Sequence, residues 1–532
     1  MNIPFIIALI ALALMGTVVG LSIKRDLMMY QQNSYRPDRY CRWMREAAES
    51  TRTSRLMAMA LALLMLSRFA HPVIALVLAA VFALWEIILL SRKKYKKPLV
   101  FTPRARRIYT VAAALTAVFA AAVACFGTGP SGHLYWAVVA LAAVYAVSYW
   151  VLMAADWLLR PVEKSINRRY YREAASILAS MPDLKIIGIT GSYGKTSTKH
   201  YLHRILSEQF DVLMTPGNFN TTLGVIRTVR EHLKPYNEVF IVEMGAKQPG
   251  DIREICSLVH PTRGILTAVG PQHLESFGSI ENVQATKFEL VDALPADGLA
   301  VINDDFPYIA DRPVSSCRCS RYAVEHTAGA DFRATDIRYT PKGTHFTIRD
   351  AAGAEVITLY THLVGRCNVS NLLAAVIMAL DMGVDKDKIR YAVEQIAQVE
   401  HRLSIKTTPG GLTIIDDAYN SNPVGSQMAM EVLAGMTSGK RIVITPGMIE
   451  LGADQHRLNA DLGEAVGHSA DIAIIVGEYN RDAILEGISR AGMDQSRVHT
   501  VDTFAQAQQL MISLAAPGDT VLYENDLPDT FK

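Results

Sequence analysis

Residues 188–198 read Gly-Ile-Thr-Gly-Ser-Tyr-Gly-Lys-Thr-Ser-Thr. The stretch follows a short β-like run, Lys185–Ile187, and precedes a helix-like segment, Lys199–Gln209. A strand, a glycine-rich turn and a helix start form a phosphate cradle, because backbone N–H groups and the helix dipole face the anion. The lysine of such a loop reaches the β- and γ-phosphates of ATP, and the next hydroxyl holds Mg²⁺. The sequence therefore predicts ATP and Mg²⁺ as cofactors, bound by Gly191, Ser192, Tyr193, Gly194, Lys195, Thr196 and Ser197.

Composition limits the remaining possibilities. A chain of 532 residues is too long for one core, so we expect two to four domains. The net charge of +2 gives no support for a nucleic-acid partner. The six cysteines are scattered, which argues against a disulfide framework or a four-ligand zinc site, although Cys317 and Cys319 could form half of a metal site.

Residues 1–158 are predicted to be an α-helical membrane domain. Apolar runs of about the 20 residues that a bilayer requires recur there. Charged or turn-forming residues such as Arg68, His71 and Pro72 divide them. We expect about five transmembrane helices, at residues 3–23, 55–69, 72–91, 108–126 and 134–155, with a tight turn at Gly127–His133.

The basic residues predict the orientation. Eight Lys or Arg lie between residues 24 and 55, and eight more lie between residues 92 and 107. Both connections fall on the same side of the membrane if the N-terminus is outside, and the positive-inside rule makes that side cytoplasmic. We therefore predict a multi-pass protein of the cytoplasmic (inner) membrane, with everything after the last span in the cytoplasm, where ATP is present.

The rest of the chain has the pattern of α/β domains. After a linker at 159–181, apolar runs such as Val239–Val242 and Leu299–Ile302 alternate with helical stretches, which is typical of a parallel sheet. We predict a central P-loop ATP-binding domain at 182–398, with a β-rich stretch at Ala323–Thr361. A second, Rossmann-like α/β domain is predicted at 399–532; it lacks Gly-x-Gly-x-x-Gly, so a dinucleotide has little support.

Several short motifs follow the phosphate loop in order. They are Asn218–Gly224, Glu243–Ala246 with Gly250–Ile252, His273–Gly278, Lys287–Glu289, Asn303–Asp305, His401–Leu403 and Asp416–Pro423. In this order and spacing, residues 183–520 resemble the Mur ligases, and within them the branch that adds D-alanyl-D-alanine to a UDP-linked muramoyl tripeptide. The resemblance implies an ADP-forming carbon–nitrogen ligase that acts in peptidoglycan or cell-envelope precursor synthesis.

The chemistry of such a ligase explains the residue types. A carboxylate resists attack by an amine because it is anionic and has no leaving group. ATP converts the carboxylate into an acyl-phosphate, which the amine then attacks. The site must therefore hold a triphosphate and bring anions together, which requires metal ions and cationic side chains.

The resemblance also implies roles for individual residues. It assigns catalytic roles to Lys195, His273 and Lys287, and metal binding to Thr196, Glu243, His273 and Lys287, the last matching a lysine that is carbamylated in several relatives. It adds Asn303, Asn371, Arg402 and Asp417 to the ATP-binding residues. It assigns the substrate to Asn218, Asn220, Thr221, Thr222, Tyr419, Asn420 and Asn422.

Each of these residues also has a simpler explanation. Lys195 could be a surface lysine after a tight turn, Glu243 could cap a turn, and Lys287 could be a solvated charge on a helix. The asparagines and Asp417 could serve only as turn formers.

The chain also departs from the family pattern. Soluble relatives carry an N-terminal domain that grips the UDP group, and here membrane spans take its place. Cys367 stands where relatives often have histidine, and the acidic end, Asn525–Asp529, replaces a basic Gly/Ser-rich stretch. The expected partners are a precursor carboxylate, an amino-acid or dipeptide amine, and membrane lipid.

Two alternatives stay open beside the D-alanyl-D-alanine adder. One is a ligase or amidating enzyme of another envelope polymer, similar to poly-γ-glutamate synthesis. The other is a non-catalytic membrane scaffold with a decayed ligase domain.

Overall fold

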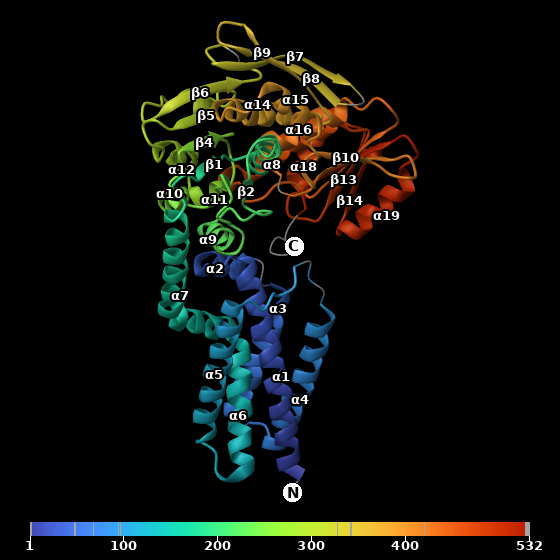
Figure 1. Ribbon diagram of the computed structural model, residues 1–532. Helices are drawn as coiled ribbons and strands as arrows, with labels where there is room; N and C mark the ends of the chain where they lie inside the picture. The colour runs from blue at the N-terminus through green and yellow to red at the C-terminus, as the bar shows by residue number, and fades with distance from the viewer. Residues whose placement is uncertain are drawn as a thin grey trace. The chain divides into compact units, whose positions relative to one another are not determined.

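The computed structural model describes residues 3–46, 49–67, 69–93, 95, 97–326, 328–340, 343–419 and 421–526 (Figure 1). These residues form two compact units, which divide at Arg168–Arg169. The first is entirely helical and the second contains two sheets, in agreement with the predicted fold classes.

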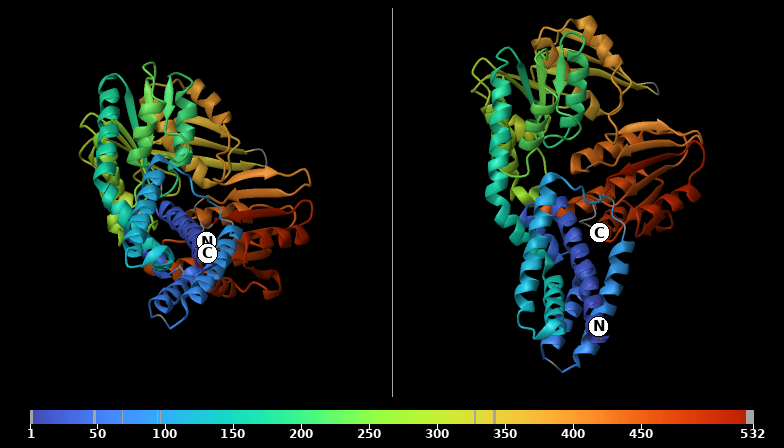
Figure 2. Two further views of the ribbon diagram at one scale, coloured as in Figure 1. Left: turned by 90° about the horizontal axis from the view of Figure 1, so that it is seen from below. Right: turned by 60° about the horizontal axis from the view of Figure 1, so that its bottom comes forward.

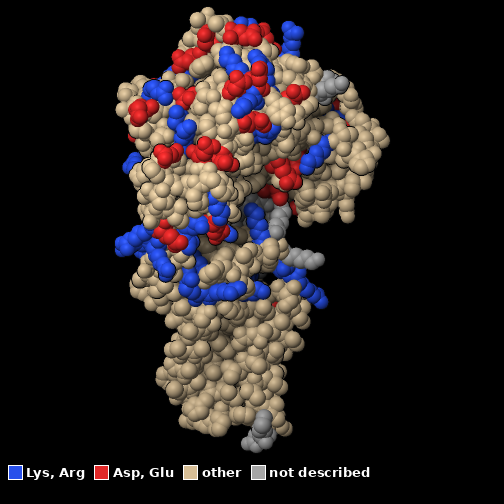
Figure 3. All heavy atoms as spheres, in the orientation of Figure 1, with Lys and Arg blue, Asp and Glu red and all other residues tan. Residues whose placement is uncertain are grey.

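The helical unit has seven helices among its described residues. They are α1 (Ile3–Gln32), α2 (Pro37–Glu46), α3 (Glu49–Ser67), α4 (Pro72–Arg92), α5 (Pro103–Ala124), α6 (Gly129–Ala146) and α7 (Ser148–Ala179), the last continuing past the division. Two of the helix starts follow directly from sequence, because His71 and Thr102 cap α4 and α5, and proline stands in the first turn of each. On the face visible in Figure 3, the helical unit shows few charged side chains along the helices and a group of Lys and Arg at one end.

Among the described residues, three helices, α1, α4 and α5, are long and apolar enough to cross a membrane, and the bent pair of α6 and α7 would make a fourth span if it crosses as one unit. A shorter apolar segment, Thr53–Ser67, lies in α3. The predicted span at 134–155 is not a single straight helix: α6 ends at Ala146, and α7 starts at Ser148 at an angle of 82° to it. The number of five spans stays a prediction, and Arg68, Lys94 and Lys96 lie outside the described residues.

The first sheet of the second unit has nine strands in the order β2-β3-β1-β4-β5-β6-β7-β8-β9. Its parallel part is β1 (Lys185–Thr190), β2 (Val212–Met214), β3 (Val239–Glu243), β4 (Arg263–Leu266), β5 (Leu299–Asn303), β6 (Arg318–Ala323) and β7 (Phe332–Thr340). Two antiparallel strands, β8 (Gly343–Asp350) and β9 (Glu355–Thr361), extend it. The predicted β-rich stretch is confirmed by β7–β9.

Helices cover both faces of this sheet. The elements are α8 (Lys195–Leu206), α9 (Thr222–Glu231), α10 (Asp251–Val259), α11 (Leu274–Phe277), α12 (Ile280–Asp292), α13 (Pro307–Ala310), α14 (Arg366–Asp381) and α15 (Lys386–Glu394). One core lies under α8, α14 and α15, and the other lies under α9, α10 and α12. Burial on both faces explains why the central strands are continuous apolar runs.

The last part of α7 belongs to the second of these cores. Ala174 is fully buried there, and Tyr171, Ile177 and Leu178 pack against the same cluster. The segment that the sequence presented as a linker at 159–181 is therefore helical through Ala179.

The second sheet has six strands in the order β10-β11-β15-β12-β13-β14 (Figure 2, orange to red). They are β10 (Ser404–Thr407), β11 (Thr413–Asp417), β12 (Arg441–Thr445), β13 (Ile472–Val476), β14 (Val498–Val501) and β15 (Thr520–Glu524). All neighbours are parallel except β10 and β11. The helices are α16 (Pro423–Ala434), α17 (Gln455–Ser469), α18 (Arg481–Arg490) and α19 (Phe504–Leu514). The predicted α/β fold of this part of the chain is thus confirmed, and its extent as a separate domain at 399–532 stays a prediction.

Candidate functional site

The turn between β1 and α8 has the backbone that a phosphate loop requires. Gly191 has φ +149° and Gly194 has φ +77°, values that other residues rarely adopt. A Cβ on Gly191 would lie 2.1 Å from Thr267 Oγ1, so the loop approaches β4 too closely for any side chain there. Because α8 begins at Lys195, the loop leads directly into a helix N-terminus.

Lys195 lies inside this loop. Its Nζ donates hydrogen bonds to the carbonyls of Gly191 at 2.6 Å and Ser192 at 3.1 Å. Burial lowers the pKa of Lys195 to about 8, and the nearby Glu243 carboxylate opposes that shift. The loop therefore holds a lysine that is protonated at neutral pH and close to losing its proton above it.

Glu243 ends β3 beside the loop and is 1% exposed. Its Oε1 accepts hydrogen bonds from Thr196 Oγ1 at 3.2 Å and from Asn220 Nδ2 at 3.1 Å. Burial acts to raise the pKa of Glu243, but the charges of Lys199 and Lys195 outweigh it and the pKa lies below its usual value. Two predicted residues, Thr196 and Asn220, therefore contact the ionised carboxylate of a third, Glu243.

The sequence analysis missed Lys199. This side chain is fully buried, and its Nζ lies 3.0 Å from Glu243 Oε2 and donates to the Gly217 carbonyl at 2.6 Å. It thus connects α8, the end of β3 and the loop that carries Asn218 and Asn220. The available signal was its position four residues after Lys195, which places both lysines on one face of the helix.

His273 lies directly before α11, and Lys287 lies on the next helix, α12. His273 precedes α11 with φ +54°, and its Nδ1 contacts Glu450 Oε2, a residue that the sequence analysis did not select. Burial lowers the pKa of His273, although Glu450 opposes the shift. Lys287 on α12 is 2% exposed, and burial together with the charge of Lys195 lowers its pKa well below the usual value.

The structure does not join every predicted metal ligand. Thr196 and Glu243 are in contact, whereas His273 pairs with Glu450 and Lys287 packs near the Phe277 ring, 5.9 Å from its centroid. Among the described residues, no three His, Cys, Asp or Glu side chains form a group that could hold a metal ion. A metal at Thr196 and Glu243 would therefore need ligands from a bound substrate.

A cavity of about 330 Å³ collects most of the predicted ATP-binding residues. Its lining comes from the phosphate loop, β5, α14, β11 and the start of α16, and it includes Tyr193, Gly194, Ser197, Asn303, Asn371, Arg402, Asp417, Asn422 and Cys367. Asn303 already donates to Thr267 O at 2.9 Å and to Ser370 Oγ at 3.1 Å. Burial raises the pKa of the Cys367 thiol to about 12.

Asp417 and Arg402 form the wall of this cavity contributed by the second sheet. Burial raises the pKa of Asp417 to about 6, with Arg402 acting in the opposite direction. Asp417 Oδ1 accepts a hydrogen bond from Leu403 N at 3.0 Å, and the Arg402 guanidinium lies 4.2 Å from the Tyr419 ring centroid. The two sheets therefore contribute to one site.

A second cavity, of about 640 Å³, borders the same loop. Thr196, His200, Asn218, Arg402 and Tyr419 line it, together with the segment 395–401. Asn218 Nδ2 donates to Tyr419 OH at 2.6 Å, which joins two of the predicted substrate residues across 201 positions of sequence.

The other predicted substrate residues have local structural contacts. Thr221 and Asn422 cap α9 and α16 by accepting hydrogen bonds from Gly224 N and Gly425 N. Thr222 Oγ1 donates to Glu254 Oε2 at 2.8 Å. Asn420 lies outside the described residues.

Two known protein-family models match the second unit of the chain. The family model described as Mur ligase middle domain matches residues 189–379, and the one described as Mur ligase, glutamate ligase domain matches residues 401–523. UDP-N-acetylmuramoyl-tripeptide–D-alanyl-D-alanine ligase of Escherichia coli is 30% identical over 355 residues, which cover 66% of this chain and 78% of that protein. The chain belongs to the Mur ligase family. Members of this family are ATP-dependent, ADP-forming amide ligases.

Other relatives agree with this Mur ligase assignment. The ligase of the same description from Bacillus subtilis is 28% identical, covering 64% of this chain and 72% of its own length. A crystal structure of MurF from Acinetobacter baumannii superposes with a TM-score of 0.61 and 26% identity, covering 68% and 77% of the two chains. MurF from Thermotoga maritima, solved in complex with ADP, shares the fold with a TM-score of 0.61.

Proposed function

We propose that this Mur ligase is a membrane-anchored enzyme that uses ATP and Mg²⁺ to join an amine to a carboxylate of a peptidoglycan precursor. The acceptor class is a muramoyl peptide, and the amine is D-alanyl-D-alanine or a similar small peptide. The observation that carries the proposal is the junction of the phosphate loop with Glu243, Asn220 and Lys199. The names of the relatives support the substrate class.

The residues present fit a magnesium ion. Mg²⁺ prefers oxygen ligands and is commonly bound by one or two carboxylates together with substrate phosphates. Thr196 Oγ1 and Glu243 Oε1 lie 3.2 Å apart and provide one hydroxyl and one ionised carboxylate. These two residues would hold the ion, which would neutralise the charge on the transferring phosphoryl group.

The chain's own groups account for the other requirements. Lys195 is a cation in the loop that faces the phosphates, and it would stabilise the charge that develops when the precursor carboxylate attacks. Arg402 and Asp417 would position the nucleotide from the second sheet. Asn218 and Asn220 would orient the acceptor, because their loop contacts both Glu243 and Tyr419.

Lys287 fits carbamylation. Burial lowers the pKa of Lys287 well below its usual value, so this amine loses its proton more readily than an ordinary lysine, and only the neutral amine reacts with CO₂. The product would be an anion held beside the loop. His273, with its Nδ1 bound by Glu450, would offer its Nε2 as a further ligand.

The membrane location rests on apolar helices α1, α4 and α5. Basic segments near residues 24–55 and 92–107 would attract anionic headgroups by about 1 kcal/mol per charge. We therefore infer that the helical unit presents a lipid-linked or otherwise anionic precursor, in place of a UDP-binding domain.

The test compares the full-length Lys195→Ala and Glu243→Gln variants with the unaltered full-length protein. ATP-dependent formation of an amide product should fall by at least 100-fold in each variant, because each removes charge stabilisation from phosphoryl transfer. Arg490→Ala, which breaks an exposed pair with Glu486 on α18, is the matched control and should keep full activity. Near-normal turnover by a folded Lys195→Ala protein would refute the assignment of the loop.

A different amine donor is the second candidate. β15 ends in Glu524, which is fully buried beside Asp417 on the neighbouring strand. Burial and the Asp417 charge raise the pKa of Glu524 well above its usual value. Two acidic side chains therefore lie together at this end of the sheet, which favours an amine without a carboxylate over a dipeptide. A parallel assay with D-alanyl-D-alanine and with ammonia would separate the two donors.

A further inference from the structure

We infer that the first half of α7 lies flat in the cytoplasmic interface of the membrane and binds lipid through an outward apolar face. The inference rests on the proposed membrane location and goes beyond it. The partner is the boundary between headgroups and acyl chains of an anionic leaflet.

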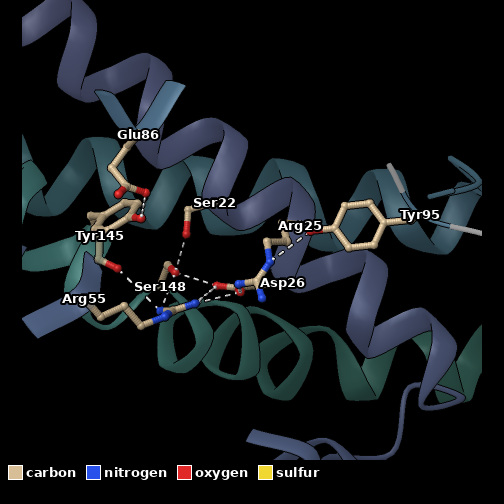
Figure 4. Close-up of polar contacts among 8 residues, drawn as sticks. All are labelled: Ser22, Arg25, Asp26, Arg55, Glu86, Tyr95, Tyr145 and Ser148. Atoms are coloured by element: carbon tan, nitrogen blue, oxygen red, sulfur yellow. Dashed lines mark hydrogen bonds and ion pairs between the residues drawn. The ribbon is translucent and has the colours of Figure 1, made fainter. Parts of the chain in front are cut away.

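The bend between α6 and α7 is fixed by a buried polar cluster (Figure 4). At the first residue of α7, Ser148 Oγ donates to Asp26 Oδ2 at 2.5 Å and lies 2.9 Å from Ser22 Oγ. Arg55 donates to both oxygens of Asp26, at 2.8 and 3.0 Å, and contacts the Tyr145 carbonyl at 3.5 Å. Because Arg55 also satisfies a carbonyl at the end of α6, the cluster holds the 82° turn in place.

A second carboxylate strengthens the same corner. Glu86 of α4 is 2% exposed and accepts hydrogen bonds from Tyr145 OH at 2.7 Å and Ser54 Oγ at 2.6 Å. Charged groups inside a membrane bundle are costly unless they are paired and hydrogen-bonded. Five helices, α1, α3, α4, α6 and α7, therefore meet at the bend through polar contacts. Such contacts indicate a defined corner and not a frayed span.

Beyond the bend, α7 has its polar side inward. Asp156 is 3% exposed and accepts from Tyr30 OH at 2.9 Å and Arg104 at 3.2 Å. Glu163 is 7% exposed and accepts hydrogen bonds from Arg107 Nε at 2.7 Å and Arg107 Nη2 at 2.9 Å. The acidic side chains of this segment thus face the helical unit.

The outward side of the same segment is apolar. Trp150 is 53% exposed, Trp157 63%, Leu158 48% and Val162 46%. Trp150, Ala154, Trp157 and Leu158 form one stripe at helical spacing, on the side away from the fully buried Ser148, Leu152 and Ala155, and Val162 flanks this stripe. A helix with acids inside and tryptophans outside is unfavourable in water, but it suits a surrounding of lipid.

The residues of this stripe also indicate how deep the first half of α7 lies in the membrane. Tryptophan is enriched at the level of the headgroups, where one end of the ring is apolar and the other is wet. Arg160 is half exposed, and Lys164 and Arg168 are exposed farther along the helix, so cations lie beside the stripe. This pattern of apolar and cationic residues is typical of helices that lie in the interface of an anionic membrane.

The test is a depth profile of spin labels on the full-length protein, with its six cysteines replaced, in vesicles of phosphatidylethanolamine and phosphatidylglycerol. Single labels replace Trp150, Ala154, Trp157 and Leu158 on α7. Control labels replace exposed residues of α4, namely Ile74, Val77, Val81, Leu84 and Ile88. Accessibility to oxygen and to an aqueous nickel complex gives the depth of each label.

We expect the α7 labels to share one depth near the headgroups, within a few ångströms. The α4 labels should differ in position along the membrane normal by about 20 Å from Ile74 to Ile88, at 1.5 Å per residue, so their depth should rise toward the middle of the helix and fall again. A steady gradient along α7 would show that it spans the membrane and would overturn the inference. Labels on α7 shielded from both reagents would show a protein contact, such as a second copy, and would equally overturn it. If the α4 labels also lie in water, the proposed membrane location fails, and this inference fails with it.

Discussion

Replacing Lys199 with methionine should destabilise the second unit strongly. Lys199 and Glu243 are 0% and 1% exposed, and their charged atoms lie 3.0 Å apart. Methionine keeps most of the volume but leaves Glu243 as a buried carboxylate without its closest cation. Breaking a buried pair by removing one partner costs about 3–5 kcal/mol. Because each kcal/mol of lost stability lowers the Tm of a large unit by about 2 °C, the Tm should fall by at least about 6 °C.

The assay is thermal unfolding of the full-length protein in detergent, followed by circular dichroism, with two reference variants. Lys199→Met/Glu243→Gln removes both charges and should recover most of the lost Tm, since no unpaired charge remains buried. Arg490→Met breaks a pair that is 47% and 44% exposed, and it should shift the Tm by less than about 1 °C. The reasoning is refuted if Lys199→Met unfolds within about 2 °C of the unaltered protein, or if the double variant is less stable than the single one.

Three further predictions concern the site and the membrane. Burial lowers the pKa of Lys195 to about 8, so Lys195 carries its charge below that pH and loses it above. The affinity for ADP, measured by calorimetry, should therefore decline from pH 7.5 to 9.5. An affinity that does not change over this range would contradict the prediction. Lys287→Ala should lose activity, and added short carboxylates should restore part of it if a carbamate is the missing anion; full activity in the variant would make Lys287 an ordinary buried lysine. In intact cells, a cysteine at Lys97 or in the second unit should be protected from an impermeant reagent, and labelling of the second unit from outside would reverse the predicted topology.

Local sequence signals predicted the fold well where the physical cause is local. The phosphate loop, the buried parallel strands and the starts of α4 and α5 all depend on residues within a few positions of each other. The bend at Val147 was not predicted, because apolar residues continue on both sides of it and hydropathy does not report direction. The residues that hold it, Asp26 and Arg55, are more than 90 positions away from Ser148.

The same distinction between local and tertiary causes applies to the candidate site. Lys195, Thr196 and Glu243 follow from motifs, and the structure brings them together. Lys199 and Glu450 were missed, since their partners are set by tertiary packing, and the only local signal for Lys199 was its position four residues after Lys195. Thr221 and Asn422 have the composition of helix caps, a local signal that explains their contacts without a substrate.

The most direct measurement is product analysis with the purified full-length protein in lipid, supplied with ATP, Mg²⁺, UDP-N-acetylmuramoyl-tripeptide and D-alanyl-D-alanine. Mass spectrometry and ADP release are followed together, with the Glu243→Gln protein as the reference. We predict ADP release that requires both the carboxylate and the amine, and an amide product of the summed mass less water, both absent in the variant. Binding of ADP without any amide product, from this pair or from a lipid extract supplied with amines, would contradict a ligase function.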